Sequence, residues 1–278
     1  MVLTSRESAL LEAFQTNECG MSAGNHRGLR DRLKQRRPLG VFWMSTGSIA
    51  VLELAARAEP DAVVIDAQHG LWDRLAIEHA VGLASRHVPV LVRTAENTPV
   101  AISQALDAGA NGVIIPLIED AEAAARAVAA ARFPPHGVRS GGGVRPVAQG
   151  FADYYADANA GTVVGVMIET KRGVDNVRAI AGTAGVDFIF IGSGDLALSL
   201  GTFPQLDPRF DEACRTVLNA CNTAGVPCGI FTNDADSAIS RSGEGYALVV
   251  AANDIAVIAA GFSFAMNKFR TAPADGRD

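Results

Sequence analysis

Residues 163–195 read VVGVMIETKRGVDNVRAIAGTAGVDFIFIGSGD. This stretch contains two apolar, β-branched runs, Val163–Ile168 and Asp187–Ile191, with an amphipathic segment, Val174–Thr183, between them. Runs that are apolar throughout, rather than alternating with polar residues, are typical of strands buried on both faces, as in a parallel sheet. The stretch therefore predicts one strand-helix-strand unit of an α/β protein.

The same alternation extends along most of the chain. Six further apolar runs predict strands at Leu39–Met44, Ala62–Ile65, Val88–Val92, Gly112–Leu117, Val226–Phe231 and Tyr246–Ala251. Segments rich in Ala, Leu and Glu predict further helices at Ser48–Ala58, Arg74–Arg86, Pro99–Ala108, Asp120–Arg132, Pro208–Ala224, Asp234–Ser242 and Asp254–Lys268. Eight strands alternating with eight helices predict a (β/α)8 TIM barrel. A doubly wound sheet is the structural rival, but no Gly-rich dinucleotide turn follows the first strand.

Two segments lie outside this alternation. Residues 1–35 form an N-terminal extension that we expect to be poorly ordered, residues 36–270 form the barrel, and residues 271–278 form a C-terminal tail. Phe133–Gly161 is a long insertion, and loops of this length in compact domains are usually functional, often lids. Its Gly141–Gly143 run has no following Lys-Ser/Thr, which favours a flexible loop over a phosphate cradle.

Composition and charge exclude several classes of protein. The 278 residues are 49% hydrophobic and 19% charged, which excludes a disordered or low-complexity chain. The net charge of −6 argues against nucleic-acid binding, because phosphate recognition needs clustered positive charge. The sequence shows neither an uncharged run long enough to span a membrane nor a signal peptide, so we expect a cytoplasmic protein. Its four cysteines form no CxxC motif, and we interpret them as reduced structural thiols.

Charged and polar residues follow several of the expected strands, where the reactive groups of (β/α)8 barrels lie. In chain order, these residues are Asp66, His69, Arg93, Glu169 and Asp195. Taken singly, a strand-end Asp often caps the next helix, and a lone His is often a surface or core residue. Together on one rim, Glu169 and Asp195 with His69 and Arg93 favour a functional site.

Glu169 and Asp195 are oxygen donors expected on adjacent strands, where two carboxylates can share one cation. Two protein ligands suit Mg²⁺ or Mn²⁺ and leave positions for the carboxylate and keto oxygens of a 2-oxo acid. The ion would stabilise the enolate that forms when a proton leaves the carbon beside the ketone. The backbone of Gly192, Ser193 and Gly194, which opens the next helix, would bind the substrate carboxylate.

Arg93 and His69 have separate expected roles. Because Arg93 keeps its charge, it would bind the ketone oxygen or carboxylate and offset charge in the transition state. His69 could transfer protons near neutral pH. Either Asp66, three residues earlier, or Asp107 could orient His69 and raise its basicity.

Together these residues resemble the HpcH/HpaI aldolase family, metal-dependent pyruvate aldolases that include the 4-hydroxy-2-oxoheptane-1,7-dioate and 2-keto-3-deoxy-sugar-acid aldolases. The similarity spans about residues 30–270. The matching motifs are Leu39-Gly40-Val41-Phe42-Trp43, Ile65-Asp66 with His69, Val92-Arg93 with Asn97 and Pro99, Leu106-Asp107-Ala108-Gly109-Ala110, Ile115-Pro116, Arg132-Phe133-Pro134-Pro135 through Gly137 and Arg139, Ile168-Glu169-Thr170, and Ile191-Gly192 with Asp195-Leu196. The resemblance implies a barrel of the phosphoenolpyruvate/pyruvate-binding type and a divalent metal, Mg²⁺, Mn²⁺ or Co²⁺, bound by Glu169 and Asp195.

The resemblance also implies roles for single residues. His69 would be the acid/base group, Arg93 would stabilise the transition state, Asp107 would raise the basicity of His69, and Gly194 would bind pyruvate through its backbone. It further implies a trimer of dimers in which a C-terminal helix, here Asp254–Lys268, is exchanged between partners. An ordinary barrel helix would show the same sequence pattern.

Two departures from the family pattern leave the reaction open. The family usually has Glu-His where this chain has Gln68-His69, and often a Gln where this chain has Met167. The expected reaction is that of an aldehyde-lyase, which cleaves a 4-hydroxy-2-oxo acid to pyruvate and an aldehyde through an enolate. The alternative is a citrate-synthase-like condensing transferase or a decarboxylase acting on oxaloacetate, and the third hypothesis is a catalytically silent oxo-acid-binding oligomer.

Overall fold

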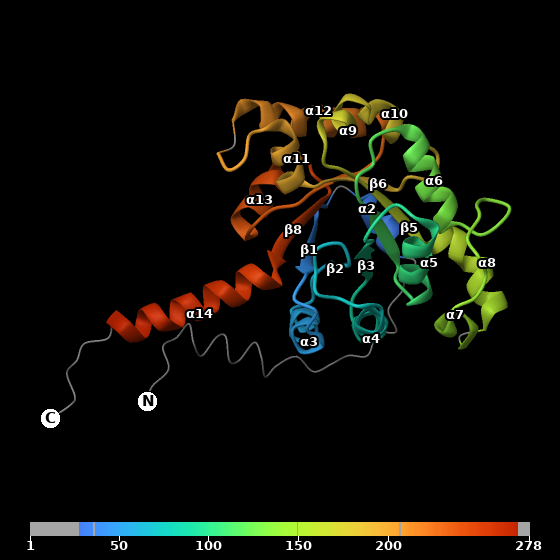
Figure 1. The fold of residues 1–278 in the computed structure, drawn as a ribbon, viewed down its shortest axis with the longest axis horizontal. Coiled ribbons are helices and arrows are strands. Elements are labelled where there is room, and N and C mark those ends of the chain that lie inside the picture. The colour runs from blue at the N-terminus through green and yellow to red at the C-terminus, as the bar shows by residue number, and fades with distance from the viewer. Residues whose placement is uncertain (1–27, 36, 149, 206, 272–278) are drawn as a thin grey trace.

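The computed structural model describes residues 28–271 except residues 36, 149 and 206. Eight parallel strands pair in chain order and close into a barrel, because the last strand pairs with the first (Figure 1). The strands are β1 (Leu39–Met44), β2 (Ala62–Asp66), β3 (Val90–Arg93), β4 (Gly112–Ile115), β5 (Val163–Ile168), β6 (Phe188–Ile191), β7 (Cys228–Ile230) and β8 (Leu248–Asn253). The expected (β/α)8 barrel is confirmed, and its closure excludes a doubly wound sheet.

Helices cover the outside of the barrel (Figure 1). They are α2 (Gly28–Leu33), α3 (Ile49–Arg57), α4 (Arg74–Ala84), α5 (Pro99–Asp107), α6 (Ala121–Ala131), α7 (Val144–Ala148), α8 (Phe151–Gly161), α9 (Lys171–Asp175), α10 (Val177–Ala181), α11 (Ser193–Leu200), α12 (Pro208–Ala224), α13 (Ala235–Gly243) and α14 (Asp254–Thr271). Several begin after a Ser, Thr or Asp whose side chain accepts a hydrogen bond from the first turn, as at Ser48, Thr98 and Asp120. Local sequence signals therefore set these helix starts.

The core has two layers of apolar side chains. An outer layer lies between the strands and the helices, and an inner layer fills the barrel. Within the inner layer, the Trp43 and Phe190 rings stack with their centroids 5.6 Å apart. Because the barrel interior is packed with side chains, polar residues that point inward can gather only at its open end.

Helix α2 lies within the segment for which we expected poor order. Its Leu29 and Leu33 are buried in the inner layer. Arg30 donates to the Asp187 carboxylate at 2.7 Å, directly before β6, so α2 covers the amino-terminal end of the barrel. Residues 28–33 are therefore an ordered part of the fold, and the expectation for residues 1–27 lies outside the described residues.

The insertion Phe133–Gly161, expected as a loop, contains helices α7 and α8. The ring of Phe133 packs against the rings of Phe151, Tyr154 and Tyr155, with centroids 5.4–6.2 Å apart. These aromatic contacts explain why a segment rich in Gly and Pro is nonetheless helical. One other helix prediction changes, because two short helices, α9 and α10, replace the single helix expected at Val174–Thr183, and a helix that was not among the predicted ones, α11, follows β6.

Other expectations concern the membrane and the thiols. Among the described residues, no helix has the length and apolar character needed to cross a membrane. Cys214, Cys221 and Cys228 are free and buried, which confirms them as structural thiols, whereas Cys19 lies outside the described residues. Burial raises the pKa of Cys214 to about 12, so its thiol stays protonated at neutral pH. The cytoplasmic location stays a prediction.

Candidate active site

Asp66 and Arg93 form a buried ion pair at the carboxyl ends of β2 and β3. They are register partners in the parallel ladder, so their side chains emerge side by side. The two side chains are 3% and 8% exposed. Arg93 donates from Nε to Asp66 Oδ1 at 2.8 Å and from Nη2 to Oδ2, which is the bidentate arrangement that fixes both groups.

The indole of Trp43, on β1, supports this pair. Its Nε1 donates to Asp66 Oδ2 at 3.1 Å, and the Arg93 guanidinium lies 5.0 Å from the ring centroid. Burial by itself raises the pKa of Asp66, but the hydrogen bond and charge of Arg93, with the hydrogen bonds from the His69 N–H and the Trp43 indole, together outweigh burial and lower that pKa. Asp66 is therefore an anion at neutral pH and holds Arg93 at the open end of the barrel.

Asp66 contacts His69 through the backbone rather than through the imidazole. Its Oδ1 accepts from the N–H groups of Gln68 at 3.1 Å and His69 at 3.2 Å. The His69 ring is exposed and has no hydrogen-bond partner among the described residues. Asp66 thus fixes the turn that carries His69 but does not set the tautomer of its ring.

Asp107 lies at the other end of the barrel from His69. It is the last residue of α5, whose carboxyl end leads into the start of β4, whereas His69 follows the carboxyl end of β2. Its carboxylate accepts a hydrogen bond from Arg139 Nη2 at 2.7 Å. Contrary to our expectation, Asp107 of the same chain does not orient His69, because parallel topology separates helix ends from strand ends.

Glu169, directly after β5, has one satisfied and one unsatisfied oxygen. The residue is 1% exposed. Its Oε1 accepts a hydrogen bond from the Leu117 N–H at 2.7 Å. Its Oε2 is buried and has no partner among the described residues. A buried carboxylate oxygen without a partner is costly, which points to a ligand.

The pKa of Glu169 reflects this environment. The pKa is raised to about 7, mainly by burial; the nearby Asp195 carboxylate also raises it, whereas the Leu117 N–H and the Arg93 charge lower it. Gly192, after β6, leaves the carboxylate its room, since a Cβ at that position would lie 2.5 Å from Oε2. The carboxylate therefore has space and a need for a cation beside it.

Helix α11 brings Asp195 and a row of backbone N–H groups to the same place. Gly192 is its N-cap, and no side chain in the described part of the chain caps its first turn, so the N–H groups there can bind a carboxylate. Ser193 Oγ donates to the Phe231 carbonyl at 2.9 Å, which fixes the start of the helix. Gly194 and Asp195 follow in the first turn and are accessible to solvent.

The donors at this site fit a divalent cation. Within the described part of the chain, no three His, Cys, Asp or Glu side chains converge on one point. Glu169 and Asp195 would thus supply two ligands and leave other positions to water or substrate. Oxygen donors, the unpartnered Oε2 and the raised pKa fit Mg²⁺ or Mn²⁺.

Comparison with known proteins identifies the family. The family model described as HpcH/HpaI aldolase/citrate lyase matches residues 39–259. The chain belongs to this family. A hydroxypyruvate/pyruvate aldolase from Paraburkholderia phytofirmans is 35% identical and covers 82% of this chain and 91% of its own length. A 5-keto-4-deoxy-D-glucarate aldolase from Salmonella arizonae is 35% identical, and the match covers 79% of this chain and 87% of the relative.

Solved structures of HpcH/HpaI proteins share the fold. A family member from Burkholderia cenocepacia superimposes with a TM-score of 0.84 at 36% identity, covering 88% of this chain and all of its own. A structure described as citrate synthase SbnG superimposes with a TM-score of 0.78 at 25% identity, covering 87% and 97%. Proteins similar to this chain are therefore named both as aldolases and as a citrate synthase.

The two departures from the HpcH/HpaI pattern lie close to the charged groups. Met167 is buried in the barrel two residues before Glu169, and a Cβ on Gly192 would lie 3.0 Å from its methyl carbon. Met167 therefore forms part of the floor beneath the Glu169 carboxylate. Gln68 is partly buried, and its Oε1 has no partner among the described residues.

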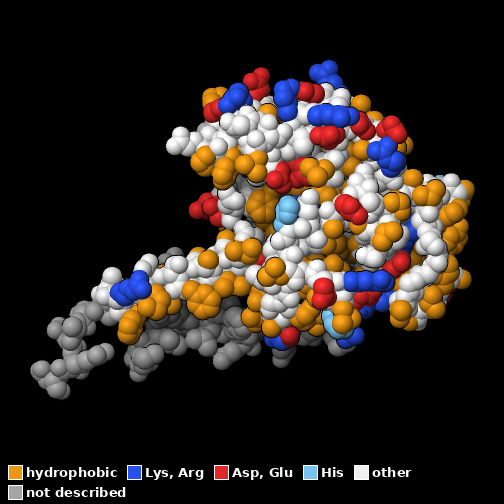
Figure 2. All heavy atoms as spheres, in the orientation of Figure 1, with side chains coloured by type: hydrophobic (Ala, Val, Ile, Leu, Met, Phe, Trp, Pro, Cys, Tyr) orange, Lys and Arg blue, Asp and Glu red, His pale blue; other side chains and the backbone are white. Residues whose placement is uncertain are grey.

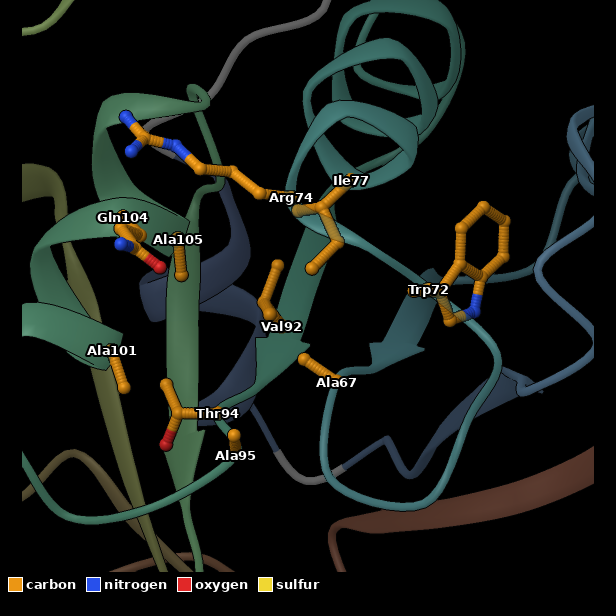
Figure 3. A pocket seen from close by; sticks show the side chains of 10 residues that line it. All are labelled: Ala67, Trp72, Arg74, Ile77, Val92, Thr94, Ala95, Ala101, Gln104 and Ala105. Carbon is orange, nitrogen blue, oxygen red and sulfur yellow. The ribbon is translucent and has the colours of Figure 1, made fainter.

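A separate cavity of about 180 Å³ lies behind this rim, between α4 and α5 (Figure 3). Val92 and Thr94 line it, whereas Arg93 between them pairs with Asp66 in the barrel mouth. Because neighbouring strand residues point to opposite faces, the cavity is outside the barrel and apart from the charged groups. One member of the site, Leu117, takes part through its backbone N–H, a role that its side chain does not signal in the sequence.

Proposed function

We propose that the protein is a divalent-metal-dependent aldolase that cleaves a 4-hydroxy-2-oxo acid to pyruvate, or a close 2-oxo acid, and an aldehyde. The observation that carries this proposal is the buried Glu169 carboxylate, whose Oε2 has no partner among the described residues beside Asp195 and the start of α11. The names of the two aldolase relatives support the reaction class.

Glu169 and Asp195 would hold the ion, Mg²⁺, Mn²⁺ or Co²⁺. Bound there, a divalent ion supplies Lewis acidity toward the keto and carboxylate oxygens of the substrate. The N–H groups of Ser193 and Gly194 bind the substrate carboxylate at the helix start. Gly192 keeps this space open, because a side chain at that position would collide with Glu169.

His69 and Arg93 act on the reacting atoms. In cleavage, His69 takes the proton from the C4 hydroxyl, the C3–C4 bond breaks, and C4 leaves as the aldehyde. The electron pair of that bond becomes the enolate of pyruvate, which is then protonated at C3. Arg93, fixed by Asp66, places a permanent positive charge where the substrate oxygen gains negative charge.

The exchange of pyruvate methyl protons into deuterated water, followed by NMR, tests the enolate step. Exchange should require Mg²⁺ or Mn²⁺, and a chelator should stop it. Asp195→Asn should weaken metal binding and slow exchange at subsaturating metal. If no metal supports exchange, the protein is not a pyruvate aldolase.

Replacement of His69 tests the acid/base role. His69→Ala should slow retro-aldol turnover by about 10²–10⁴-fold and leave Mn²⁺ binding unchanged, because the ring is not a metal ligand. His79→Ala, at another exposed histidine on α4, is the matched control and should turn over at the wild-type rate. Wild-type turnover in His69→Ala would show that another group moves the proton.

The second candidate function is condensation of oxaloacetate with an acyl donor, or decarboxylation of oxaloacetate. The two departures from the family pattern, Gln68 and Met167, favour it, and the similarity to a structure named citrate synthase supports it. Oxaloacetate turnover with an acyl-CoA, together with no pyruvate release from any 4-hydroxy-2-oxo acid, would favour this candidate over the aldolase.

We further propose a homo-oligomer, a trimer of dimers that exchanges α14. Helix α14 extends away from the barrel, and apolar side chains lie along it (Figures 1 and 2). Ile255, Val257, Phe262, Phe264 and Phe269 are 57–72% exposed. Such a surface is typical of a protein interface. Light scattering should give the mass of six chains, and a lower mass when Phe262 and Phe264 are both changed to Glu.

A further inference from the structure

Asp254 is a buried carboxylate at the point where β8 ends and α14 begins. It is 5% exposed. Its Oδ1 accepts from the N–H groups of Ser45 and Ile255, both at 2.9 Å. Its Oδ2 accepts from the N–H of Thr46 at 2.9 Å and from the Thr46 hydroxyl at 2.6 Å. Four donors thus converge on one carboxylate and fix the turn after β1.

The residues at the start of this turn also accept hydrogen bonds from the segment that follows β2. The Ser45 carbonyl accepts from the Leu71 N–H at 2.8 Å, and the Met44 carbonyl accepts from Trp72 Nε1 at 2.8 Å. The two segments touch backbone to backbone, since a Cβ on Gly70 would lie 3.0 Å from the Ser45 carbonyl oxygen. The segment that makes these contacts, Gly70–Trp72, directly follows His69.

A second contact links the same turn to the ion pair of the site. Ser45 Oγ donates to Asp66 Oδ2 at 3.3 Å. Asp66 accepts a hydrogen bond from the His69 N–H. The backbone around His69 is therefore held by Asp66 at His69 itself and by the Ser45 carbonyl at Leu71. The His69 ring makes no hydrogen bond within the described chain, and its position therefore depends on how firmly its backbone is held.

We propose that Asp254 is a positioning residue for His69, acting through the Ser45–Thr46 turn and the Leu71 N–H. The assignment of His69 as acid/base group rests on the proposed function. Asp254 also forms the start of α14, so the direction of that helix and the position of His69 share one anchor. Neither Asp254 nor Thr46 is among the residues that the proposed function places on the substrate or the metal.

Asp254→Asn is the sharpest variant. The amide keeps the shape of the side chain but turns one oxygen into an N–H donor, which then faces donors of Ser45 or Thr46. We expect kcat of the retro-aldol reaction to fall about 10–100-fold, because small displacements of a catalytic group have effects of this size. KM and Mn²⁺ affinity should stay at wild-type values, since Glu169 and α11 are unchanged.

Two further variants bracket this change. Thr46→Val removes only the hydroxyl donor and should lower kcat less than Asp254→Asn, while Thr46→Ser keeps that donor and should restore the wild-type rate. Asp234→Asn is the matched control, because Asp234 caps α13 in a capping box closed on Ser237, and it should leave kcat unchanged.

Two measurements report on the position of His69 without turnover. The His69 ring resonance, assigned by its loss in His69→Gln, should shift in Asp254→Asn, and hydrogen exchange at the Leu71 N–H should become faster. If no substrate is turned over, the proposed function fails while these two measurements still test the positioning. Wild-type kcat together with unchanged His69 resonance and Leu71 exchange overturns the proposal. If Asp254→Asn does not fold, the comparison of Thr46→Val with Thr46→Ser decides in the same way.

Discussion

Two buried carboxylates at the open end of the barrel have opposite environments. Asp66, at the carboxyl end of β2, accepts hydrogen bonds from a bidentate Arg93, the Trp43 indole and two backbone N–H groups, and its pKa is lowered. Glu169, directly after β5, accepts one N–H, from Leu117, among the described residues, and its pKa is raised to about 7. Both residues are almost fully buried.

The difference separates a structural carboxylate from one available to a ligand. A buried charge is stable only when charges or hydrogen bonds compensate its desolvation. The protein supplies that compensation at Asp66 and leaves it incomplete at Glu169. The β2–β3 side of the site is therefore complete within one chain, whereas the β5–β6 side would be completed by a cation.

Removing Arg93 should have the largest effect, because it leaves the Asp66 charge buried and unpaired. Arg93→Ala should lower the free energy of unfolding by about 3–5 kcal/mol. It should also remove about 3–4 kcal/mol of transition-state stabilisation from the aldol reaction. Urea unfolding and steady-state kinetics measure the two effects.

The double variant Asp66→Asn with Arg93→Ala is the control for this prediction. It should regain much of the lost stability, because no charge is left buried, but it should not regain the rate. An unchanged free energy of unfolding in Arg93→Ala would mean that Asp66 is compensated by something other than Arg93.

Replacing Glu169 should have the opposite effect on the free energy of unfolding: it should stabilise the metal-free protein. In protein freed of metal by a chelator, Glu169→Gln should raise the free energy of unfolding at pH 8 by about 1–3 kcal/mol, because it removes a poorly compensated charge and keeps the acceptor for Leu117. The same variant should weaken Mn²⁺ binding. Glu122→Gln, at an exposed ion pair on α6, is the control and should change stability by less than about 0.5 kcal/mol. A destabilised metal-free Glu169→Gln protein would contradict the comparison.

Glu169 and Asp66 should affect the pH dependence of the free energy of unfolding in opposite directions. The folded pKa of Glu169, about 7, lies above its ordinary value of 4.5, so the folded protein binds this proton more tightly than the unfolded chain. Its contribution is present below pH 4.5 and is lost as the pH rises to 7, with a slope of at most about 1.4 kcal/mol per pH unit. Asp66, with its lowered pKa, contributes above pH 3.8 and loses that contribution as the pH falls.

Unfolding of metal-free wild type and Glu169→Gln across this pH range isolates the Glu169 contribution as the difference between the two curves. Saturating Mn²⁺ should reverse the sign of the difference, because the ion needs the deprotonated carboxylate. Parallel curves without metal would show that Glu169 ionises at its ordinary pKa.

The smallest effect is expected at Ser45, whose hydroxyl makes the longest side-chain contact to Asp66, at 3.3 Å. Ser45→Ala should lower stability by about 0.5–1 kcal/mol, because Arg93 and Trp43 still hold the carboxylate. Its backbone contacts to Asp254 and Leu71 are unaffected by the change. A loss of rate as large as that of Arg93→Ala would show that the Asp66 pair depends on this hydroxyl.

Much of the barrel could be predicted because its signals are local. The strands Leu39–Met44 and Val163–Ile168 match β1 and β5 residue for residue, since each is an apolar run bounded by turn residues. Placing polar residues at the rim then required only the topological rule that strand ends of a barrel meet.

The errors came from contacts distant in sequence. The insertion after α6 is helical because Phe133 packs against aromatic residues about twenty positions later, which periodicity does not detect. The family resemblance implies that Asp107 acts on His69, but the end of α5 lies at the opposite end of the barrel in the same chain, where Asp107 accepts a hydrogen bond from Arg139. Leu117 contributes a backbone group, and its side chain carries no signal of that role.

By itself, the sequence determined the number of strands, their order along the chain and the identity of the residues at the rim, because these follow from short apolar runs and their turn residues. Only the tertiary structure decided which rim carboxylate is paired with a positive charge of the protein. That outcome depends on groups that barrel closure brings together: Arg93, 27 residues from Asp66, and the Leu117 N–H, 52 residues from Glu169. Desolvation and pairing act through space, so two acids that look alike in the sequence have opposite pKa shifts in the fold.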